Sequence, residues 1–489
     1  MIPGIRPKLE LLSRELILKI IDEAHVLLDR DGVFVENAEA RSLFRAAGAR
    51  VDEASQRVHL RPELVRDSLA TTPAILRLFD RSGDKEFVVG GDNVHFNPGS
   101  AAVKILDHET GDERKPVTFD LVRLCRLTEK LENVHLQSTA LVSGDVPEII
   151  ADSYRLFVGL RFCSKPVVTG TFRTAGFRPM FEMLAAVRSG AEELRRKPLA
   201  IFDACPSPPL KWSNLTAQSL IDCARAGIPS ELISMGLTGA TSPVTLTGTL
   251  VQHVAENLAG LVICQLARRG APVIFGGSPA SFDMRKGTTP MGAIETMMID
   301  VAYSQIGKHL GLPTHAYMGL SDAKINDPQS GLETGIGAVL AALAGINVVS
   351  GAGMMDFESA QSLEKLLIDD EICGMAYRLI LGISQREDPL ALRVFEELGA
   401  GAEFLTMAHT RKWYRIEHTY PRLIDRDTYD VWAGLGKRSM SDRAHSRLEQ
   451  ILAEEAGEGL SADLRAALKE IMEADARRNG IDHLPSFGI

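Results

Sequence analysis

Short apolar runs alternate with helical stretches along most of the chain, and this alternation constrains the fold more than any other feature. Several of the helical stretches end at a glycine, which is the usual end of a helix that a short loop joins to a strand. About eight such units favour a closed (β/α)8 TIM barrel over an open sheet. The apolar runs have the length of buried strands and lie at 135–142, 166–172, 199–206, 232–239, 272–277, 313–319, 346–353 and 404–410.

The first 115 residues follow a different pattern. An amphipathic helix is expected before Gly32, because Ile17, Ile20, Ile21, Ala24 and Leu28 fall on one helical face. Further on, 76–106 alternates short strand-like runs with turns. We therefore expect an N-terminal α+β cap region over 1–115, and the barrel with a helical C-terminal extension over 116–489.

Composition narrows the class of protein. The chain has 489 residues and is 45% hydrophobic, which is enough to bury a large core in a soluble protein. Its net charge of -10 argues against a surface that binds nucleic acid. The six cysteines are scattered without metal-ligand spacing, so we expect no metal site and a reducing compartment. Charges interrupt the N-terminal segment where a signal peptide needs an apolar core. These features predict a cytoplasmic protein.

One uncharged segment, 334–355, is nearly long enough to cross a bilayer. Gly345 ends its helical part, and the β-branched run that follows is typical of a buried strand. We therefore interpret the segment as a helix followed by a strand, and we expect no membrane association.

Polar residues gather where the predicted strands end. In a barrel of this kind the loops after the strands build the active site, which makes these residues candidates for substrate binding. A buried residue that bonds to a neighbouring strand is the alternative for each of them. The candidates at strand ends are Asp203, His315, Tyr317 and His409.

Two further segments combine polar residues with buried surroundings. The predicted helix around 245–262 places Gln252 and Glu256 four residues apart on one face, with an exposed carboxylate as the alternative. The loop 319–335 carries Asp322, Lys324, Gln329 and Glu333 between two apolar segments. Either these loop residues hold one end of a substrate or the loop itself, or Asp322 and Lys324 simply pair with each other.

The run 275–278 contains two glycines and a serine after a predicted strand. Backbone N–H groups in such a turn can hold a phosphate. The alternative is that the turn needs glycine for steric reasons, and the usual phosphate site of a barrel lies after later strands.

Several motifs together resemble the trimethylamine:corrinoid methyltransferase superfamily. They are "AHVLLDRDGVFVENAEARSLFRAAGARVD", "VIFGGSPASFDMRKG", "SDAKINDPQSGLETG" and "INVVSGAGMMDFESAQSLEKLLIDDEICG", and the likeness runs over nearly the whole chain. The resemblance implies a (β/α)8 barrel that moves a methyl group from an amine nitrogen to the Co(I) centre of a separate corrinoid protein. It implies no tightly bound cofactor on this chain.

The chain departs from the founding branch of that superfamily in having only standard amino acids, without pyrrolysine. A quaternary ammonium has no lone pair for an electrophilic imine to engage, so this departure points to a quaternary amine such as glycine betaine. Under the resemblance, Phe96 and Tyr317 suit the methylated cation and Lys324 suits a carboxylate. Two alternatives stay open: a relative that binds such amines without catalysis, and a phosphate-binding barrel lyase or isomerase. We also expect a homo-oligomer.

Overall fold

The computed structural model describes residues 3–99, 101–107, 109–399, 403–454 and 459–487. Parallel strands form its centre, and their runs of Val, Ile and Phe are buried on both faces, as in α/β proteins. These central strands are β6 (His95–Pro98), β9 (Gln137–Ser138), β10 (Val167–Thr169), β11 (Ala200–Ala204), β13 (Ser230–Ser234), β15 (Val273–Gly277), β17 (His315–Tyr317) and β18 (Val348–Ala352).

The central strands pair in two parallel groups, with the orders β15-β13-β11-β10-β9 and β17-β18-β6. Isolated parallel bridges join the groups at both edges. Phe275 bridges to Thr314 before β17, and Phe96 of β6 bridges to Val134 before β9. The arrangement is a mixed α/β fold of TIM-barrel type.

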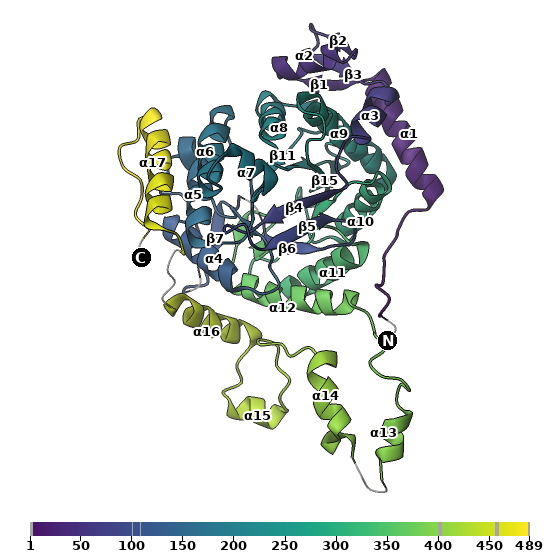
Figure 1. Ribbon diagram of the computed structural model, residues 1–489, viewed down its shortest axis with the longest axis vertical. Coiled ribbons are helices and arrows are strands. Elements are labelled where there is room, and N and C mark those ends of the chain that lie inside the picture. Colours follow the sequence, from purple (N-terminus) through teal and green to yellow (C-terminus); the bar gives the residue numbers. More distant parts are fainter. Residues whose placement is uncertain (1–2, 100, 108, 400–402, 455–458, 488–489) are drawn as a thin grey trace.

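Helices surround the central strands (Figure 1). α8 shows how the sequence sets their ends: Ser213 accepts a hydrogen bond from the Thr216 N–H, and Gly227 ends the helix in the left-handed region. The surrounding helices are α4 (Thr118–Lys130), α5 (Ala151–Phe162), α6 (Phe177–Val187), α7 (Ala191–Arg196), α8 (Asn214–Ala226), α9 (Leu246–Ala267), α10 (Ile294–His309), α11 (Pro328–Ala344) and α12 (Leu363–Ile380).

One of these helices, α9, is long and apolar enough to cross a membrane, but 83% of its apolar stretch is buried inside the protein. It is a core helix. The uncharged segment 334–355 also has a place in the core, because it forms the end of α11 and then β18, as predicted.

Six of the eight predicted strand runs contain a central strand, the run 232–239 overlaps the end of β13, and the last run is wrong. The run 404–410 forms the 3-10 helix η3 (Phe404–Thr406) and the start of α14 (Ala408–Glu417) instead. Its place in the strand order is taken by β6, which pairs with β18. The predicted boundary at residue 116 therefore leaves one central strand on its N-terminal side.

The first helices of the chain lie on the outer helices: α1 and α3 on α9, and α2 on α8 and α9 (Figure 1). The predicted amphipathic helix is α1, and its five predicted apolar residues are all buried. The elements are α1 (Arg14–Arg30), β1 (Val33–Val35), α2 (Ala38–Ala46), β2 (Arg50–Asp52), β3 (Arg57–His59) and α3 (Pro62–Leu69), followed by β4 (Ile75–Phe79), β5 (Glu86–Gly90), β7 (Lys104–Leu106) and β8 (Glu113–Arg114).

Short elements in the loops complete the fold. They are η1 (Glu148–Ile150), η2 (Thr174–Gly176), β12 (Lys211–Trp212), β14 (Leu237–Thr238), β16 (Ala280–Ser281), β19 (Met354–Met355) and β20 (Ala360–Gln361).

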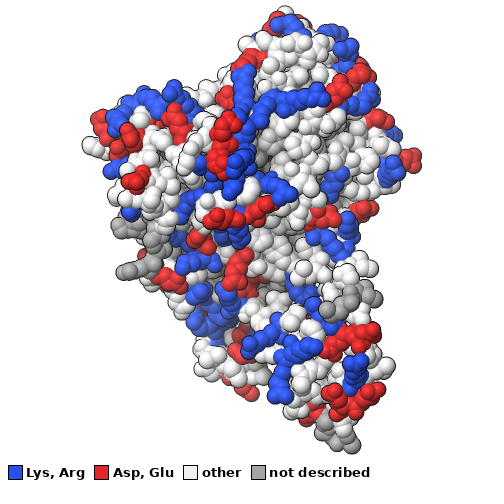
Figure 2. Space-filling view, viewed as in Figure 1, with Lys and Arg blue, Asp and Glu red and all other residues white. Residues whose placement is uncertain are grey.

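The C-terminal part divides into two. α16 (Met440–Ala453) packs against α4 and α12, and α17 (Ala462–Arg478) packs against α5 and α6. Before them, α13 (Leu392–Glu397), η3, α14 and α15 (Tyr429–Gly434) extend away from the barrel (Figure 1). Figure 2 shows basic and acidic side chains intermixed over the visible face of the molecule, without a large patch of one sign.

Candidate functional site

Two carboxyl groups meet at the centre of the strand assembly. Asp203 of β11 and Glu231 of β13 are partners in the strand register, and Glu231 is fully buried. Among the described residues, no outside donor reaches either oxygen of Glu231 or Oδ1 of Asp203, and the two carboxyl groups hydrogen-bond to each other when one of them is protonated. Because buried polar groups normally have more partners than this, the pair is costly to the fold and is a candidate site for a ligand.

Burial changes the ionisation of this pair. It raises the pKa of Asp203 to about 7. For Glu231, burial together with the neighbouring charge of Asp203 raises the pKa well above its usual range. The pair therefore holds at least one proton near neutral pH.

His315 of β17 faces the same interior. Its Nε2 lies 3.7 Å from Glu231 Oε2 and 3.0 Å from Ser350 Oγ, which in turn accepts a hydrogen bond from Asn97 Nδ2 at 2.9 Å. Burial lowers the pKa of His315 to about 3, so its ring is neutral. The ring of Tyr317 meets the His315 ring edge-on, with 5.0 Å between their centres.

An arginine that the sequence pattern did not single out lies beside the carboxyl pair. Arg155 of α5 is 2% exposed, and its Nη1 donates to the Thr139 carbonyl at 2.6 Å. Its guanidinium lies 4.2 Å from the ring centre of Phe172. Burial lowers its pKa to about 10, and the charges of Asp152 and, to a smaller extent, Asp203 act against this shift. The interior thus contains a positive charge next to the titrating carboxyl pair.

A strained turn brings a further acidic residue to the same end of the strands. Asp356, Phe357 and Glu358 have φ values of 48°, 56° and 67°, which is the left-handed region that favours glycine. The Ser278 hydroxyl donates to Glu358 Oε1 at 3.1 Å, and burial raises the pKa of Glu358 to about 8. Strain of this kind is found where a side chain must be held in one place.

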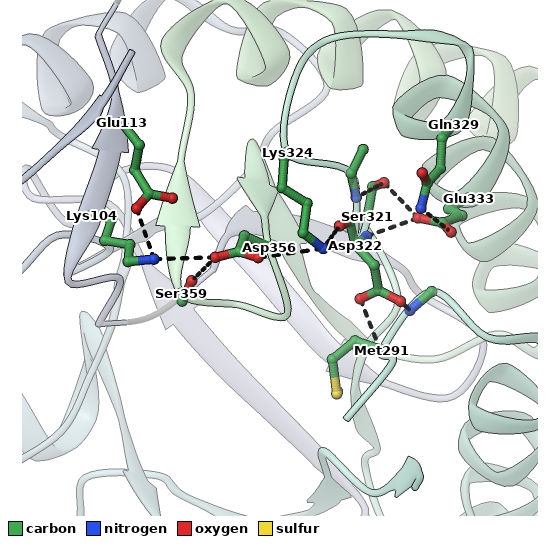
Figure 3. A network of polar contacts seen from close by, with 12 residues as sticks. Lys104, Glu113, Met291, Ser321, Asp322, Lys324, Gln329, Glu333, Asp356 and Ser359 are labelled. Carbon is green, nitrogen blue, oxygen red and sulfur yellow. Dashed lines mark hydrogen bonds and ion pairs between the residues drawn. The ribbon is translucent and has the colours of Figure 1, made fainter. Parts of the chain in front are cut away.

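The polar loop after β17 has its partners within the protein (Figure 3). Asp322 accepts hydrogen bonds from the backbone N–H groups of Met291 and Gly292, both at 2.9 Å. Glu333 accepts from Ser321 Oγ, from the backbone N–H of Asp322 and from Gln329 Nε2, at 2.6, 2.8 and 2.9 Å. Asp322, Gln329 and Glu333 therefore hold the loop in shape.

Lys324 also has partners nearby (Figure 3). Its Nζ donates to the backbone carbonyl of Asp322 at 2.6 Å, lies 3.4 Å from the Asp356 carboxylate and sits 3.8 Å from the ring centre of Phe357. The alternative that the Lys324 and Asp322 side chains pair with each other is therefore wrong. The side chain of Lys324 forms its ion pair with Asp356. Lys104 lies on the other side of Asp356, also at 3.4 Å.

Gln252 and Glu256 lie on one face of α9, as predicted, and the alternative of an exposed carboxylate is wrong. Glu256 is fully buried, and it accepts hydrogen bonds from the backbone N–H of Leu210 at 2.8 Å, from Gln252 at 3.0 Å and from the Ser234 hydroxyl. Gln252 also donates to the Thr241 carbonyl. The two residues tie α9 to the loops around it.

Two other candidate residues lie away from the carboxyl pair. Phe96 is fully buried and packs against Tyr377 of α12, with 5.4 Å between the ring centres, while its neighbour Asn97 faces Ser350. His409 was expected at the end of a strand, yet it lies in α14 outside the barrel, 3.6 Å from Glu387.

The glycines at the end of β15 are required by packing. A Cβ atom on Gly276 would lie 2.9 Å from His315 Cβ, and one on Gly277 would lie 2.4 Å from His253 Nε2. The Gly276 N–H donates to Asn257 Oδ1 and the Ser278 N–H donates to the Ser234 carbonyl. These N–H groups are not free for a phosphate, so the geometry favours the steric explanation.

Comparisons with known proteins relate the chain to methylamine and betaine methyltransferases. The chain is 32% identical to trimethylamine methyltransferase MttB of Desulfitobacterium hafniense, over 93% of this chain and 92% of the relative. It is 31% identical to a glycine betaine methyltransferase of the same species, over 97% of this chain and 98% of the relative. The crystal structure of monomethylamine methyltransferase MtmB from Methanosarcina barkeri covers 92% of this chain and 95% of its own, with a TM-score of 0.48 and 13% identity. Residues 2–480 match the trimethylamine methyltransferase (MTTB) family, and the chain therefore belongs to this family of methyltransferases.

Proposed function

We propose that the chain transfers a methyl group from a small quaternary amine of the glycine betaine type to the Co(I) centre of a corrinoid on a separate protein. Membership of the family supports methyl transfer from a methylated amine. The 31% identity to a glycine betaine methyltransferase supports a betaine, although relatives that act on trimethylamine are equally similar. The choice between these substrates therefore rests on the interior of the barrel.

The observation that carries the proposal is the pairing of opposite charges in that interior. Arg155 can bind a carboxylate, whereas Asp203 and Glu231, next to the ring of Tyr317, can face a methylated cation. A betaine has both of these groups in one small molecule. Trimethylamine has no carboxylate, so it leaves Arg155 without a role in binding.

The charge balance favours a zwitterion as well. Near neutral pH the raised pKa values of Asp203 and Glu231 leave the pair with about one negative charge at most, which Arg155 offsets. An interior that is close to neutral suits a substrate without net charge. A bare cation needs a surplus of carboxylates.

The residues of this chain then act mainly by positioning. They hold one N-methyl group toward the open ends of the strands, in line with the approaching Co(I) centre. The tertiary amine leaves without charge, so no general acid is required. A fully ionised carboxylate at the nitrogen stabilises the substrate cation more than the transition state. The partial protonation of Asp203 and Glu231 limits this effect.

The proposal also includes the closure of the barrel and the location of the protein in the cell. The pairing of the eight central strands, with bridges at both edges, supports a closed (β/α)8 barrel whose C-terminal strand ends form the binding site. The six cysteines are all free thiols, which supports a cytoplasmic location.

The test mixes the protein with a reduced corrinoid protein and follows the conversion of the Co(I) spectrum to that of methyl-Co(III). Glycine betaine should give faster conversion than trimethylamine or tetramethylammonium. Faster conversion with trimethylamine than with any quaternary amine contradicts the substrate class. Binding of a betaine without any conversion under confirmed Co(I) favours a binding protein instead.

A further inference from the structure

Arginines gather where three neighbouring outer helices end. Arg195 and Arg196 lie in the last turn of α7, Arg225 lies in the last turn of α8, and Arg268 follows α9 directly. A cation at the C-terminal end of a helix is stabilised by the partial negative charge of the last carbonyl groups. This effect accounts for each arginine by itself, but it gives no reason for several of them to converge on one place.

Four arginines line one pocket of about 260 Å³, which we call the arginine pocket. Three of its prolines come just before β11, β13 and β15, and they place it at the N-terminal ends of the central strands, opposite the proposed substrate site. No described residue that lines the pocket is acidic, and the rest of the lining is proline, glycine and apolar side chains. The four arginines are Arg77 of β4, Arg195, Arg196 and Arg268.

The arginine pocket lies beside the hairpin that closes this end of the barrel. The inward residues of β4 and β5, among them Leu76 and Leu78, form a buried cluster with residues near the starts of β10, β11, β15 and β18. Figure 1 shows β4 and β5 across the middle of the barrel. Because side chains alternate along a strand, Arg77 lies on the other face of β4, where it pairs with Glu86 and borders the pocket. The lining thus comes from this hairpin and from the ends of α7 and α9.

Two of the guanidinium groups crowd over a single glycine. Gly227 ends α8 in the left-handed region, and a Cβ atom there would lie 2.6 Å from Arg268 Nη1 and 3.2 Å from Arg195 Nε. Both groups carry a positive charge, and like charges at short range repel each other. An anion held between them turns this repulsion into attraction.

The hydrogen bonds inside the protein leave these groups available. Arg268 forms no ion pair with any described residue, and Arg195 Nε is buried without a hydrogen-bond partner in the part of the chain that the structure describes. Arg195 and Arg196 pair with Glu192 at 2.6 Å and Glu193 at 3.2 Å, each three residues earlier on α7, and the side chain of Glu192 is 86% exposed. Exposed ion pairs of this kind contribute little to stability, so a better ligand can displace them.

We propose that the arginine pocket binds a small anion through a phosphate group. Guanidinium groups present their N–H donors in a planar fork that fits two oxygens of a phosphate. A phosphate group carries roughly 1.5–2 negative charges near neutral pH, so it can engage Arg195 and Arg268 at the same time. The pocket is smaller than the roughly 300 Å³ at which sites for drug-sized ligands begin, which suits inorganic phosphate, pyrophosphate or the phosphate end of a nucleotide.

The position of the arginine pocket indicates what the anion does. Barrel enzymes carry out their chemistry at the C-terminal ends of the strands, and this pocket lies at the opposite ends. The bound anion therefore takes no part in methyl transfer. It connects the β4–β5 hairpin to the ends of α7 and α9, so it stabilises the closed base of the barrel, and the melting temperature should rise with its concentration.

Calorimetric titration of the full chain tests the proposal. Inorganic phosphate, pyrophosphate and a nucleoside diphosphate are compared near neutral pH, with chloride keeping the ionic strength constant. At least one should bind saturably with a Kd of about 1 mM or tighter. Tightest binding of phosphate or pyrophosphate identifies a free anion, and tightest binding of the nucleoside diphosphate identifies the phosphate end of a nucleotide. Succinate, a dicarboxylate, binding as tightly as the best of the three overturns the phosphate class.

Variants locate the bound anion. Arg268→Gln and Arg195→Gln should each weaken binding by roughly tenfold or more, because each removes one charge-assisted contact. Arg268→Lys keeps the charge but loses the fork, so it should weaken binding to a smaller extent. The matched control is Arg178→Gln on α6, a 76% exposed arginine that pairs with Glu182 outside the pocket, and it should bind as the wild type does. Circular dichroism confirms that each variant is folded.

Chemical modification gives a second measurement on the wild-type chain. Pyrophosphate should protect Arg195 and Arg268 from phenylglyoxal and leave Arg178 reactive, as mass spectrometry of the digested protein shows. Absence of saturable binding by all three phosphate compounds at about 10 mM overturns the proposal. Equal weakening in the pocket variants and in Arg178→Gln, or binding that protects neither Arg195 nor Arg268, does so too.

Discussion

The loop after β17 and the interior of the barrel are both rich in polar residues, yet their hydrogen bonding differs. In the loop, Glu333 accepts three hydrogen bonds and the Asp322 carboxylate accepts two. In the interior, the carboxyl groups of Asp203 and Glu231 hydrogen-bond to each other, and no other donor among the described residues reaches either oxygen of Glu231 or Oδ1 of Asp203. The loop attracts attention in the sequence, whereas the interior holds the groups that still need a partner.

We infer that the difference separates residues that maintain the structure from residues that bind the substrate under the proposed function. A buried polar group with partners contributes to stability, and its removal leaves those partners unpaired. A buried carboxyl group without partners lowers stability, and it persists when function requires it. Substitutions in the two regions should therefore have opposite effects on stability and on binding.

The largest expected effect concerns the stability of the fold around Asp203. Its pKa is about 7 in the folded protein against an ordinary value of 3.8, so its contribution to stability is complete below about pH 4 and is lost as the pH rises through 7. Asp203→Asn should therefore be more stable than the wild type at pH 8, by about 2–4 kcal/mol after allowance for its partial solvent contact, and similar to it at pH 4. Urea unfolding at the two pH values measures this difference. A variant equally destabilised at both pH values contradicts the assignment.

The next effect concerns Arg155. Arg155→Met should raise the KM for glycine betaine by roughly 10- to 100-fold, because a hydrogen-bonded charge pair with the carboxylate is lost. Turnover of any substrate that lacks a carboxylate should change little. Arg161→Met is the matched control, since Arg161 lies on the same helix but stacks on Phe157 and Phe162. Equal losses for substrates with and without a carboxylate argue against a role of Arg155 in recognition.

In the loop, stability should respond more than binding. Glu333→Gln should lower the free energy of unfolding by roughly 1.5–3 kcal/mol, because the carboxylate accepts three hydrogen bonds that a neutral amide replaces poorly. The KM for glycine betaine should stay within about a factor of three when the protein is folded. Gln329→Ala, which removes one exposed contact, is the mild control. An unchanged stability with a strongly raised KM reverses the assignment of the two regions.

The smallest effect concerns Tyr317. Tyr317→Leu keeps an apolar side chain but removes the aromatic face, so it should weaken binding of a quaternary amine by roughly 0.5–2 kcal/mol. Calorimetric titration measures the change. An equal loss for an uncharged isostere of the same size indicates packing instead of a contact between the ring and the cation.

The sequence predicts much of the fold because most central strands lie in short apolar runs that alternate with helices, several of which end at glycine. β6 escapes this pattern, since "HFNPG" contains few apolar residues and resembles a turn. The run 404–410 misleads for a different reason. It begins with apolar residues like a buried strand, yet its Phe404 and Leu405 are exposed on the segment that extends away from the barrel. A sequence pattern shows that a segment is apolar, but it does not show whether the fold buries that segment.

The candidate site is less accessible from sequence. Asp203, His315 and Tyr317 could be selected because they lie in or at the ends of apolar runs. Glu231 lies inside a strand and Arg155 inside a helix, where one sequence cannot distinguish an exposed charge from a buried one. The signal for Glu231 is its place in "SELIS", a charged residue within an otherwise buried strand. The loop residues were selected because so many polar residues lie close together in the sequence. The hydrogen bonds of Asp322 come from Met291 and Gly292, about thirty positions away, and one sequence does not reveal them.

The central claim is that the interior binds both ends of a zwitterion, and a titration with three ligands of similar size tests it on the chain alone. Glycine betaine has a quaternary ammonium and a carboxylate, tetramethylammonium lacks the carboxylate, and 3,3-dimethylbutanoate replaces the charged nitrogen with carbon. Calorimetry at pH 7 should show glycine betaine binding at least about tenfold more tightly than either of the others, as expected when two charged contacts are made together. Tetramethylammonium or 3,3-dimethylbutanoate binding as tightly as glycine betaine contradicts the claim.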